Sequence, residues 1–257
     1  MSFRRCRRAV ALAWALTMCL IKLAVVRARG PMTPVRRAMW LQWACSGVVA
    51  SMGIRFRVEG EPPASGLLVS NHLSYLDILI YSAAVRCVFV SKAEVNKWPY
   101  FGFTARQGGT IFIDRARRAS AHAVSQEMAF RLGDPVPILV FPEGTSSDGA
   151  QVMRFHSSLF EPAVAGSAPV TAAAVRYEIE GGRAERELCW YGDEGFLSHL
   201  WKTLDAPGFT AELRFGKPRV YADRRVAARE AHEEAAALRG SSGVLPAAAD
   251  LQARACS

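Results

Sequence analysis

His72 and Asp77 are residues of the types that move protons, and they stand five positions apart. A neutral imidazole can accept the proton of a hydroxyl group that attacks an acyl carbonyl, and a nearby carboxylate then stabilises the imidazolium. On one regular helix the two side chains would point about 140° apart, so one must lie outside the helix. Residues 66–70 fit a short buried strand and Ser74 fits an N-cap, which places His72 in a strand-to-helix turn and Asp77 in the first helical turn. The pair indicates an enzyme that activates a hydroxyl group.

The same residues also fit a purely structural interpretation. Ser74 and Asp77 have the spacing of a capping box variant, in which both side chains bond the backbone at the start of a helix. His72 would then be a packed turn residue. Residues after Asp77 help to decide between the catalytic and the structural interpretation.

Later apolar runs also end in ionisable residues. Residues 109–115 form a β-branched and aromatic run that ends in an acid and Arg115, and a guanidinium can bind a phosphate group through two hydrogen bonds. Residues 136–141 form a second run, which is followed by Pro142-Glu143-Gly144-Thr145. A third run, 169–175, begins with a proline, which a strand tolerates at its first position.

The expected elements alternate between strands and helices. Helices are expected over residues 74–84 and 118–132, the second stopped by Gly133-Asp134-Pro135. This alternation favours an α/β fold, with a mostly parallel sheet flanked by helices and with ligands at the carboxyl ends of the strands. A last strand is expected over 213–218 and a surface helix over 223–238.

Taken in order, these blocks resemble those of a known family. Residues 66–175 resemble the glycerolipid acyltransferases, in particular the 1-acylglycerol-3-phosphate (lysophosphatidic acid) acyltransferases. The resemblance is carried by four motifs in this order: His-x-x-x-x-Asp, Gly-x-x-Phe-Ile-Asp-Arg, Phe-Pro-Glu-Gly-Thr and a Pro-Val strand. The resemblance implies transfer of a fatty acyl chain from an acyl-CoA or acyl carrier protein thioester to the free hydroxyl of a lysolipid, most directly 1-acylglycerol-3-phosphate, in phospholipid synthesis. It implies no cofactor beyond that thioester co-substrate.

The resemblance also implies roles for individual residues. His72 corresponds to the general base and Asp77 to its partner. The other matched residues would bind the acceptor lipid: Gly109, Arg115, Glu143, Gly144 and Thr145.

One position departs from the family's pattern. Ser146 stands where the family commonly has an arginine after Phe-Pro-Glu-Gly-Thr. Because a charge-assisted hydrogen bond is worth about 1.5–3 kcal/mol, its loss weakens the expectation of a phosphate monoester and leaves lyso-ornithine lipid or another lysolipid as an alternative acceptor. Arg117, Arg118 and Arg154 are candidates to compensate for the missing charge.

Basic residues are concentrated at the start of the chain. The formal net charge is +9, and residues 1–58 hold 11 Lys and Arg residues and no acid, which leaves 21 of the 32 basic residues against all 23 acidic residues elsewhere. A basic front on a nearly neutral body argues against nucleic acid as a partner and favours an anionic membrane surface.

Two apolar segments lie in this basic front. Residues 9–26 follow a cluster of four arginines, and residues 38–54 follow Thr33-Pro34, a cap and a first-turn proline. Each segment would be about 25–27 Å long, slightly short of a bilayer core of about 30 Å. We therefore expect an N-terminal membrane-associated helical hairpin embedded in one leaflet, at the cytoplasmic face of the inner membrane. A spanning pair and a signal peptide are alternatives, the second disfavoured because acyl thioesters are cytosolic.

The sequence thus suggests three parts. They are a basic, apolar two-helix membrane anchor at 1–58, an acyltransferase domain at 59–240 and a loose tail at 241–257. The six cysteines show no paired spacing, so neither a disulfide framework nor a metal site is expected. The chain lacks the Gly-x-Ser-x-Gly elbow of serine hydrolases, and the alternative to an enzyme is a peripheral lipid-binding protein with the same fold.

Overall fold

The computed structural model describes residues 2–113 and 118–240. Arg115, predicted to bind the acceptor, and the predicted tail at 241–257 lie outside the described residues.

A seven-stranded sheet forms the centre of the described chain, in the order β1-β7-β6-β2-β5-β3-β4. Its neighbouring strands are parallel except for β6 and β7, which are antiparallel. The predicted mostly parallel sheet is therefore confirmed. The strands are β1 Ile54–Glu59, β2 Leu67–Ser70, β3 Val88–Lys92, β4 Ile111–Ile113, β5 Ile138–Val140, β6 Val170–Ile179 and β7 Phe209–Phe215.

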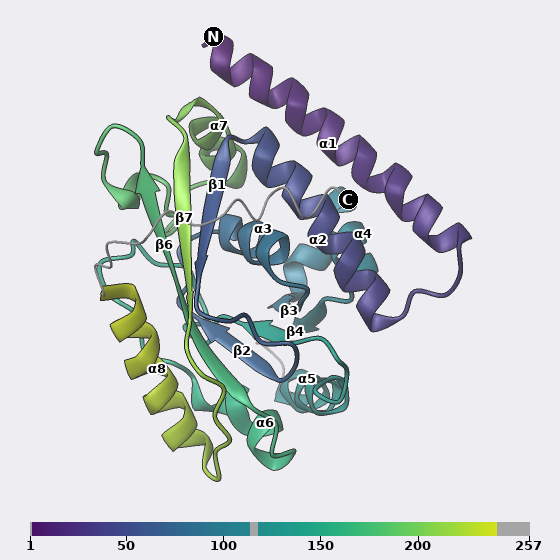
Figure 1. The fold of residues 1–257 in the computed structure, drawn as a ribbon, viewed down its shortest axis with the longest axis vertical. Helices are drawn as coiled ribbons and strands as arrows, with labels where there is room; N and C mark the ends of the chain where they lie inside the picture. Colours follow the sequence, from purple (N-terminus) through teal and green to yellow (C-terminus); the bar gives the residue numbers. More distant parts are fainter. Residues whose placement is uncertain (1, 114–117, 241–257) are drawn as a thin grey trace.

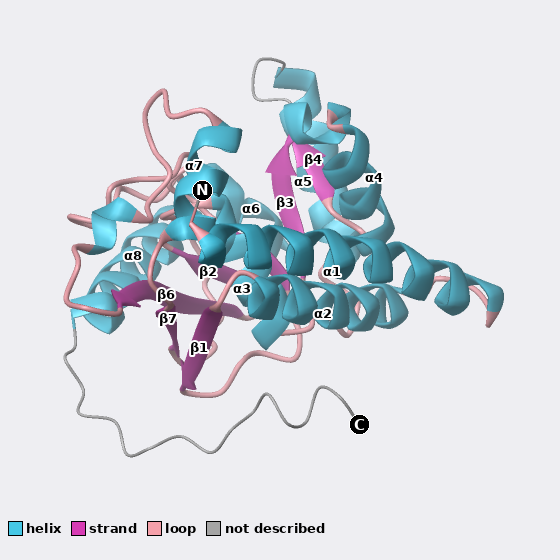
Figure 2. Cartoon of the chain, turned by 90° about the horizontal axis from the view of Figure 1, so that it is seen from above, coloured by secondary structure: helices cyan, strands magenta, loops and turns pink. Residues whose placement is uncertain are grey.

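Helices cover both faces of the sheet (Figures 1 and 2). On one face, buried side chains of α2 and α3 pack with Leu68 of β2, and on the other those of α5, α6 and α8 pack with Leu67 and Val69. This alternation follows from the two-residue period of a strand. The helices are α1 Phe3–Ala28, α2 Pro34–Ser51, α3 Tyr75–Ala84, α4 Pro99–Gly108, α5 Arg118–Arg131, α6 Glu161–Ala165, α7 Phe196–Asp205 and α8 Arg224–Gly240, with 3-10 turns η1 Ala93–Lys97, η2 Ser157–Phe160 and η3 Glu185–Glu187.

The two N-terminal apolar segments form neighbouring helices, but they have different surroundings. Among the described residues, α1 is the one helix that is long and apolar enough to cross a membrane. Only 11% of its most apolar stretch of 18 residues is buried. By contrast, α2 packs Cys45, Val48 and Val49 into the same core cluster as α3, and in Figure 1 it lies between α1 and α3. Composition alone does not distinguish an apolar helix that is covered by protein from one that is covered by lipid. Because α2 is covered by protein, α1 is the segment that keeps the expectation of membrane association.

Several predicted boundaries shift in the structure. The second helix begins at Pro34, because Thr33 caps it, and ends at Ser51 before Gly53, whose φ is +73°. Ile54 then opens β1, so the boundary predicted at residue 58 falls inside a strand. The last strand was predicted at 213–218 and is instead β7 at Phe209–Phe215, where pairing with β1 and β6 fixes it.

The N-terminal part of α1 is attached to the body of the protein. Arg8 is 8% exposed and donates hydrogen bonds to the carbonyl oxygens of Leu204 (3.3 Å) and Ala206 (2.7 Å). Arg5 forms an ion pair of 2.6 Å with Asp205. These contacts fix the start of α1 against the connection between α7 and β7.

Candidate active site

His72 and Asp77 meet in the turn between β2 and α3. His72 follows the end of β2 by two residues, and Asp77 is the third residue of α3. Their side chains are joined by a hydrogen bond of 2.8 Å between Nδ1 of His72 and Oδ2 of Asp77. The predicted geometry, with the histidine in the turn and the carboxylate in the first helical turn, is confirmed.

The Asp77 carboxylate is fully buried and accepts hydrogen bonds from several donors. Besides His72, its Oδ2 accepts the backbone N–H groups of Leu73 (2.7 Å) and Ser74 (3.1 Å), and its Oδ1 accepts the hydroxyl of Tyr177. Ser74 and Asp77 also form the capping box of α3. The capping box and the predicted contact of the two side chains are therefore both present, because one carboxylate bonds the helix start and the imidazole together.

The imidazole of His72 is held so that its other nitrogen is open. An ionised Asp77 can only accept, so Nδ1 of His72 carries the proton and Nε2 keeps its lone pair. The ring stacks on Phe141 with centroids 4.1 Å apart and planes 12° apart. The side chain is 17% exposed, and Nε2 makes no hydrogen bond within the described residues. The arrangement leaves a nitrogen that can accept a proton at the carboxyl ends of β2 and β5.

The backbone around His72 is fixed on both sides. Its N–H donates to Oε1 of Glu143 at 3.2 Å, and its carbonyl oxygen accepts the N–H of Ser147 at 2.9 Å. The side chain of the preceding Asn71 bonds both the carbonyl oxygen (3.1 Å) and the N–H (2.8 Å) of Val175 in β6. The loop after β5 and the strand β6 thus hold the turn that carries His72 from both sides.

Glu143 is buried beside this turn. It is 4% exposed, and within the described residues its Oε2 has no hydrogen-bond partner. Burial raises the pKa of Glu143 to about 8, so the carboxyl group is protonated at neutral pH. Its contact with the N–H of His72 gives Glu143 a role in holding the turn.

The other predicted acceptor-binding residues have different placements. Gly144 makes the turn after Glu143, with a φ of +78°, and Thr145 beside it is exposed. Gly109 instead ends α4 with a φ of +85°, and its carbonyl oxygen accepts Nη1 of Arg131 at 3.0 Å. It lies at the amino end of β4, which is the opposite edge of a parallel sheet from His72. The prediction that Gly109 shapes the acceptor site is therefore not supported by its position.

Two contacts of the site could not be predicted from local sequence. Tyr177 approaches Asp77 from β6, which is 100 residues away along the chain. Ser146, which replaces the arginine common in the family's pattern, donates its hydroxyl to the carbonyl oxygen of Trp190. Neither residue lies in a spacing pattern that would signal the contact.

Replacing Tyr177 by phenylalanine is expected to destabilise the protein. The change leaves Oδ1 of Asp77 buried without its donor, which costs about 1–3 kcal/mol in unfolding free energy. Chemical denaturation of the two proteins in the same detergent measures the difference. Tyr191→Phe is the matched control, since Tyr191 is 44% exposed, and an equal effect of both changes would contradict the assigned role of the Tyr177 hydroxyl.

Glu143→Gln is expected to remove a pH dependence of stability. Burial raises the pKa of Glu143 from 4.5 to about 8, so the folded state keeps a proton that the unfolded chain loses. The contribution of wild-type Glu143 to stability is therefore complete below pH 4.5 and is lost as the pH rises to about 8. The amide of the variant has no such proton to lose. The unfolding free energy of the variant should therefore rise relative to that of wild type between pH 4.5 and about 8, and the difference should stay constant at higher pH.

Unfolding free energies measured by denaturant at several pH values across this interval test the expectation. Glu94→Gln serves as the control, because the Glu94 side chain is 58% exposed. A constant difference between wild type and Glu143→Gln at all pH values would contradict burial as the cause.

Comparison with known proteins places the fold and the site in a family. The Acyltransferase family model matches residues 55–176. A lyso-ornithine lipid O-acyltransferase of Rhodobacter capsulatus is 39% identical over 183 residues, which is 68% of this chain and 65% of that protein, a little under two thirds of its length. Another, of Brucella abortus, is 35% identical over 208 residues, 74% of this chain and 78% of that protein.

Two further proteins extend this comparison. A 1-acyl-sn-glycerol-3-phosphate acyltransferase of Neisseria meningitidis is 31% identical over 172 residues, 66% of this chain and 67% of that protein. The crystal structure of the 1-acyl-sn-glycerophosphate acyltransferase of Thermotoga maritima has the same fold, with a TM-score of 0.57 and 19% identity, and the match covers 94% of this chain and all of that one. With the His72–Asp77 pair at the carboxyl end of the sheet, these matches show that the chain belongs to the glycerolipid acyltransferase family.

Proposed function

We propose that this protein is a lysolipid O-acyltransferase in which His72 is the general base. The single observation that carries the proposal is the 2.8 Å contact of His72 with the buried Asp77, which leaves Nε2 open at the edge of the sheet where ligands bind.

The reaction follows from this geometry. The free hydroxyl of the lysolipid gives its proton to Nε2 of His72 while its oxygen attacks the thioester carbonyl carbon. The carbon–sulfur bond then breaks, and the departing sulfur takes the proton from the imidazolium. Asp77 stabilises the imidazolium between the two steps and stays ionised, as the carboxylate of a catalytic triad does. The acyl donor in this proposal is a thioester of coenzyme A or acyl carrier protein, and no other cofactor takes part.

We propose lyso-ornithine lipid as the acceptor. Ser146 leaves the loop without the cation common in the family's pattern, and its hydroxyl is bonded to Trp190. An ornithine headgroup carries a carboxylate and an ammonium group and has no phosphate to pair with such a cation. Relatives named for this acceptor reach 39% identity. The second candidate is 1-acylglycerol-3-phosphate, favoured by Arg115 in the sequence and by the Neisseria relative.

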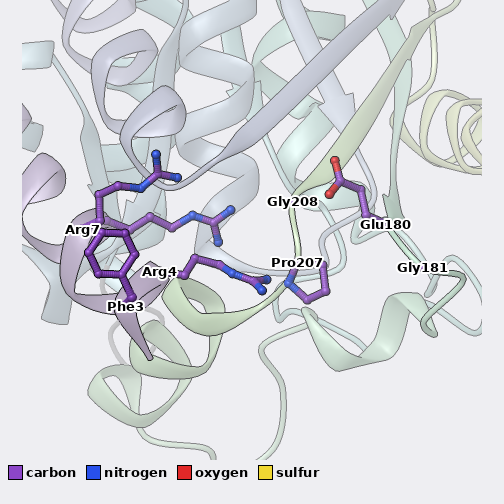
Figure 3. Close-up of a pocket in the computed structure, with 8 residues that line it drawn as sticks. Phe3, Arg4, Arg7, Glu180, Gly181, Pro207 and Gly208 are labelled. Carbon is purple, nitrogen blue, oxygen red and sulfur yellow. The ribbon is translucent and has the colours of Figure 1, made fainter. Parts of the chain in front are cut away.

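We further propose that α1 rests on an anionic leaflet at the cytoplasmic face of the membrane. Large apolar side chains on its outer surface are strongly exposed, with Phe3 at 85%, Val10 at 71% and Trp14 at 65%. Arg4 and Arg7 extend beside an open recess of about 570 Å³ that reaches Pro207 and Gly208 (Figure 3). Exposed apolar residues next to free cations are typical of helices that lie at a lipid surface.

Two acidic residues close to Arg4 and Arg7 are paired with other arginines. Asp205 is paired with Arg5 at 2.6 Å, and Glu180, which lines the recess, is paired with Arg55 at 2.5 Å. The charges of Arg4 and Arg7 are therefore available to lipid phosphates.

An acceptor panel tests the catalytic proposal. Purified enzyme with labelled acyl-CoA or acyl carrier protein thioester should acylate lyso-ornithine lipid faster than 1-acylglycerol-3-phosphate and other lysophospholipids. His72→Ala should reduce turnover by about 10²–10⁴-fold, the usual contribution of a general base, while binding of the lysolipid persists. His232→Ala is the control, because His232 lies on α8 and its ring contacts Val152 and Phe155, which follow the loop of residues 143–149. Full activity of His72→Ala would overturn His72 as the general base, whereas a wild-type protein that binds the lysolipid and acylates no acceptor would leave only a lipid-binding protein.

A vesicle assay tests the membrane proposal. Arg4→Ala/Arg7→Ala should weaken binding to phosphatidylcholine vesicles that contain phosphatidylglycerol by about 30-fold, since each basic residue near an anionic surface contributes about 1 kcal/mol. Binding to pure phosphatidylcholine should not change. Arg225→Ala/Arg229→Ala removes two exposed arginines of α8 as the matched control. Equal binding of both double variants would contradict the proposed contact.

A further inference from the structure

Arg239, in the last turn of α8, reaches two backbone positions near the site. Its Nη1 donates to the carbonyl oxygen of Val175 at 2.7 Å and its Nη2 to that of Gly149 at 2.5 Å. The side chain is 11% exposed. One guanidinium therefore joins the end of the loop after β5 to the middle of β6.

Glu185 holds this guanidinium in place. Both of its carboxylate oxygens accept hydrogen bonds from Arg239, at 2.6 and 3.3 Å, and its Oε1 also accepts the N–H of Tyr177 at 2.6 Å. Paired hydrogen bonds of this kind fix the plane of a guanidinium as well as its position. Because the pair is satisfied within the protein, Arg239 is occupied and is not a free cation for a lipid headgroup.

The two backbone positions held by Arg239 are those that fix His72. Val175 is bonded twice by the side chain of Asn71, directly before His72. Gly149 ends the loop in which Ser147 donates to the carbonyl oxygen of His72. Arg239 thus closes a ring of contacts around the turn that carries the base.

The shape of the loop at Gly149 fits this role. Its φ is +80°, and a Cβ atom at this position would lie 2.7 Å from Nη2 of Arg239. Glycine is therefore the residue that lets the guanidinium reach the carbonyl oxygen.

We propose that Arg239 and Glu185 are a positioning pair that holds the loop of residues 143–149 against β6 and so fixes the geometry of His72. This inference rests on the proposed function of His72 as the general base. Arg239 touches no reacting atom in this proposal, and both residues lie outside residues 66–175, where the sequence resembles the family's motifs.

Hydrogen exchange tests the pair independently of activity. In Arg239→Ala the amides of Ser147 and Val175 should exchange about tenfold faster or more, because a charge-assisted contact that restrains them is lost. Arg229→Ala is the matched control, since Arg229 lies on the same helix with a 63% exposed side chain and pairs there with Glu230 and Glu233. Arg239→Lys and Glu185→Gln keep part of the contact and should show intermediate exchange.

Kinetics test the effect on the base. Since a displacement of about 1 Å costs about 100-fold in rate, kcat of Arg239→Ala should fall about ten- to a hundredfold while KM for the lysolipid stays within about twofold of wild type. Added guanidinium ion at millimolar concentration should restore part of the kcat of Arg239→Ala and leave Arg229→Ala unchanged.

The possible results separate the two proposals. An inactive wild-type enzyme with fast exchange in Arg239→Ala would overturn the proposed function and leave the pair as a structural clamp. An active wild-type enzyme with unchanged kcat and exchange in Arg239→Ala would overturn the pair. A fall in kcat that guanidinium does not restore, with exchange accelerated throughout the chain, would show general destabilisation and would also overturn it.

Discussion

The buried carboxylate of Asp77 is the group on which the site depends. An ionised carboxylate without solvent is costly unless every acceptor position is used, and here the donors come from His72, the backbone at the start of α3, and Tyr177 of β6. The amino end of α3 adds the favourable field of its dipole. The same interaction starts a helix, orients the imidazole and joins both to the sheet, so the local fold and the chemistry cannot be changed separately.

The strand β6 connects this turn with the later part of the chain. It is ten residues long. Its first four residues pair with the short β2, and from Ala173 onward it pairs with β7 and forms an extension beyond β2. Val175 and Tyr177 lie on this extension and reach Asn71 and Asp77. Through this extension, β7 and α8 contribute to the surroundings of His72, because β7 pairs with it and Arg239 of α8 bonds Val175.

The sequence predicted the features that depend on local spacing. The turn with His72, the N-cap Ser74 and the mostly parallel sheet follow from short-range patterns, and all are present in the structure. Tyr177 and Arg239 were not predicted, because their contacts join positions far apart in the chain and no period marks them. The resemblance alone implied that Gly109 shapes the acceptor site, and the structure places Gly109 at the amino end of β4, because its left-handed backbone ends α4.

The attachment of α1 fixes where this helix begins relative to the turn that carries His72. Contacts of Arg8 and Asp205 hold the start of α1 at the connection before β7. The first residue of β7 pairs with Ile179, at the far end of β6. Ile179 lies four residue steps along the strand from Val175, a distance of about 13 Å. One strand therefore sets the spacing between the attached start of α1 and the turn that carries His72, because β6 extends from the residue bonded by Asn71 to the strand pairing beside which α1 is attached.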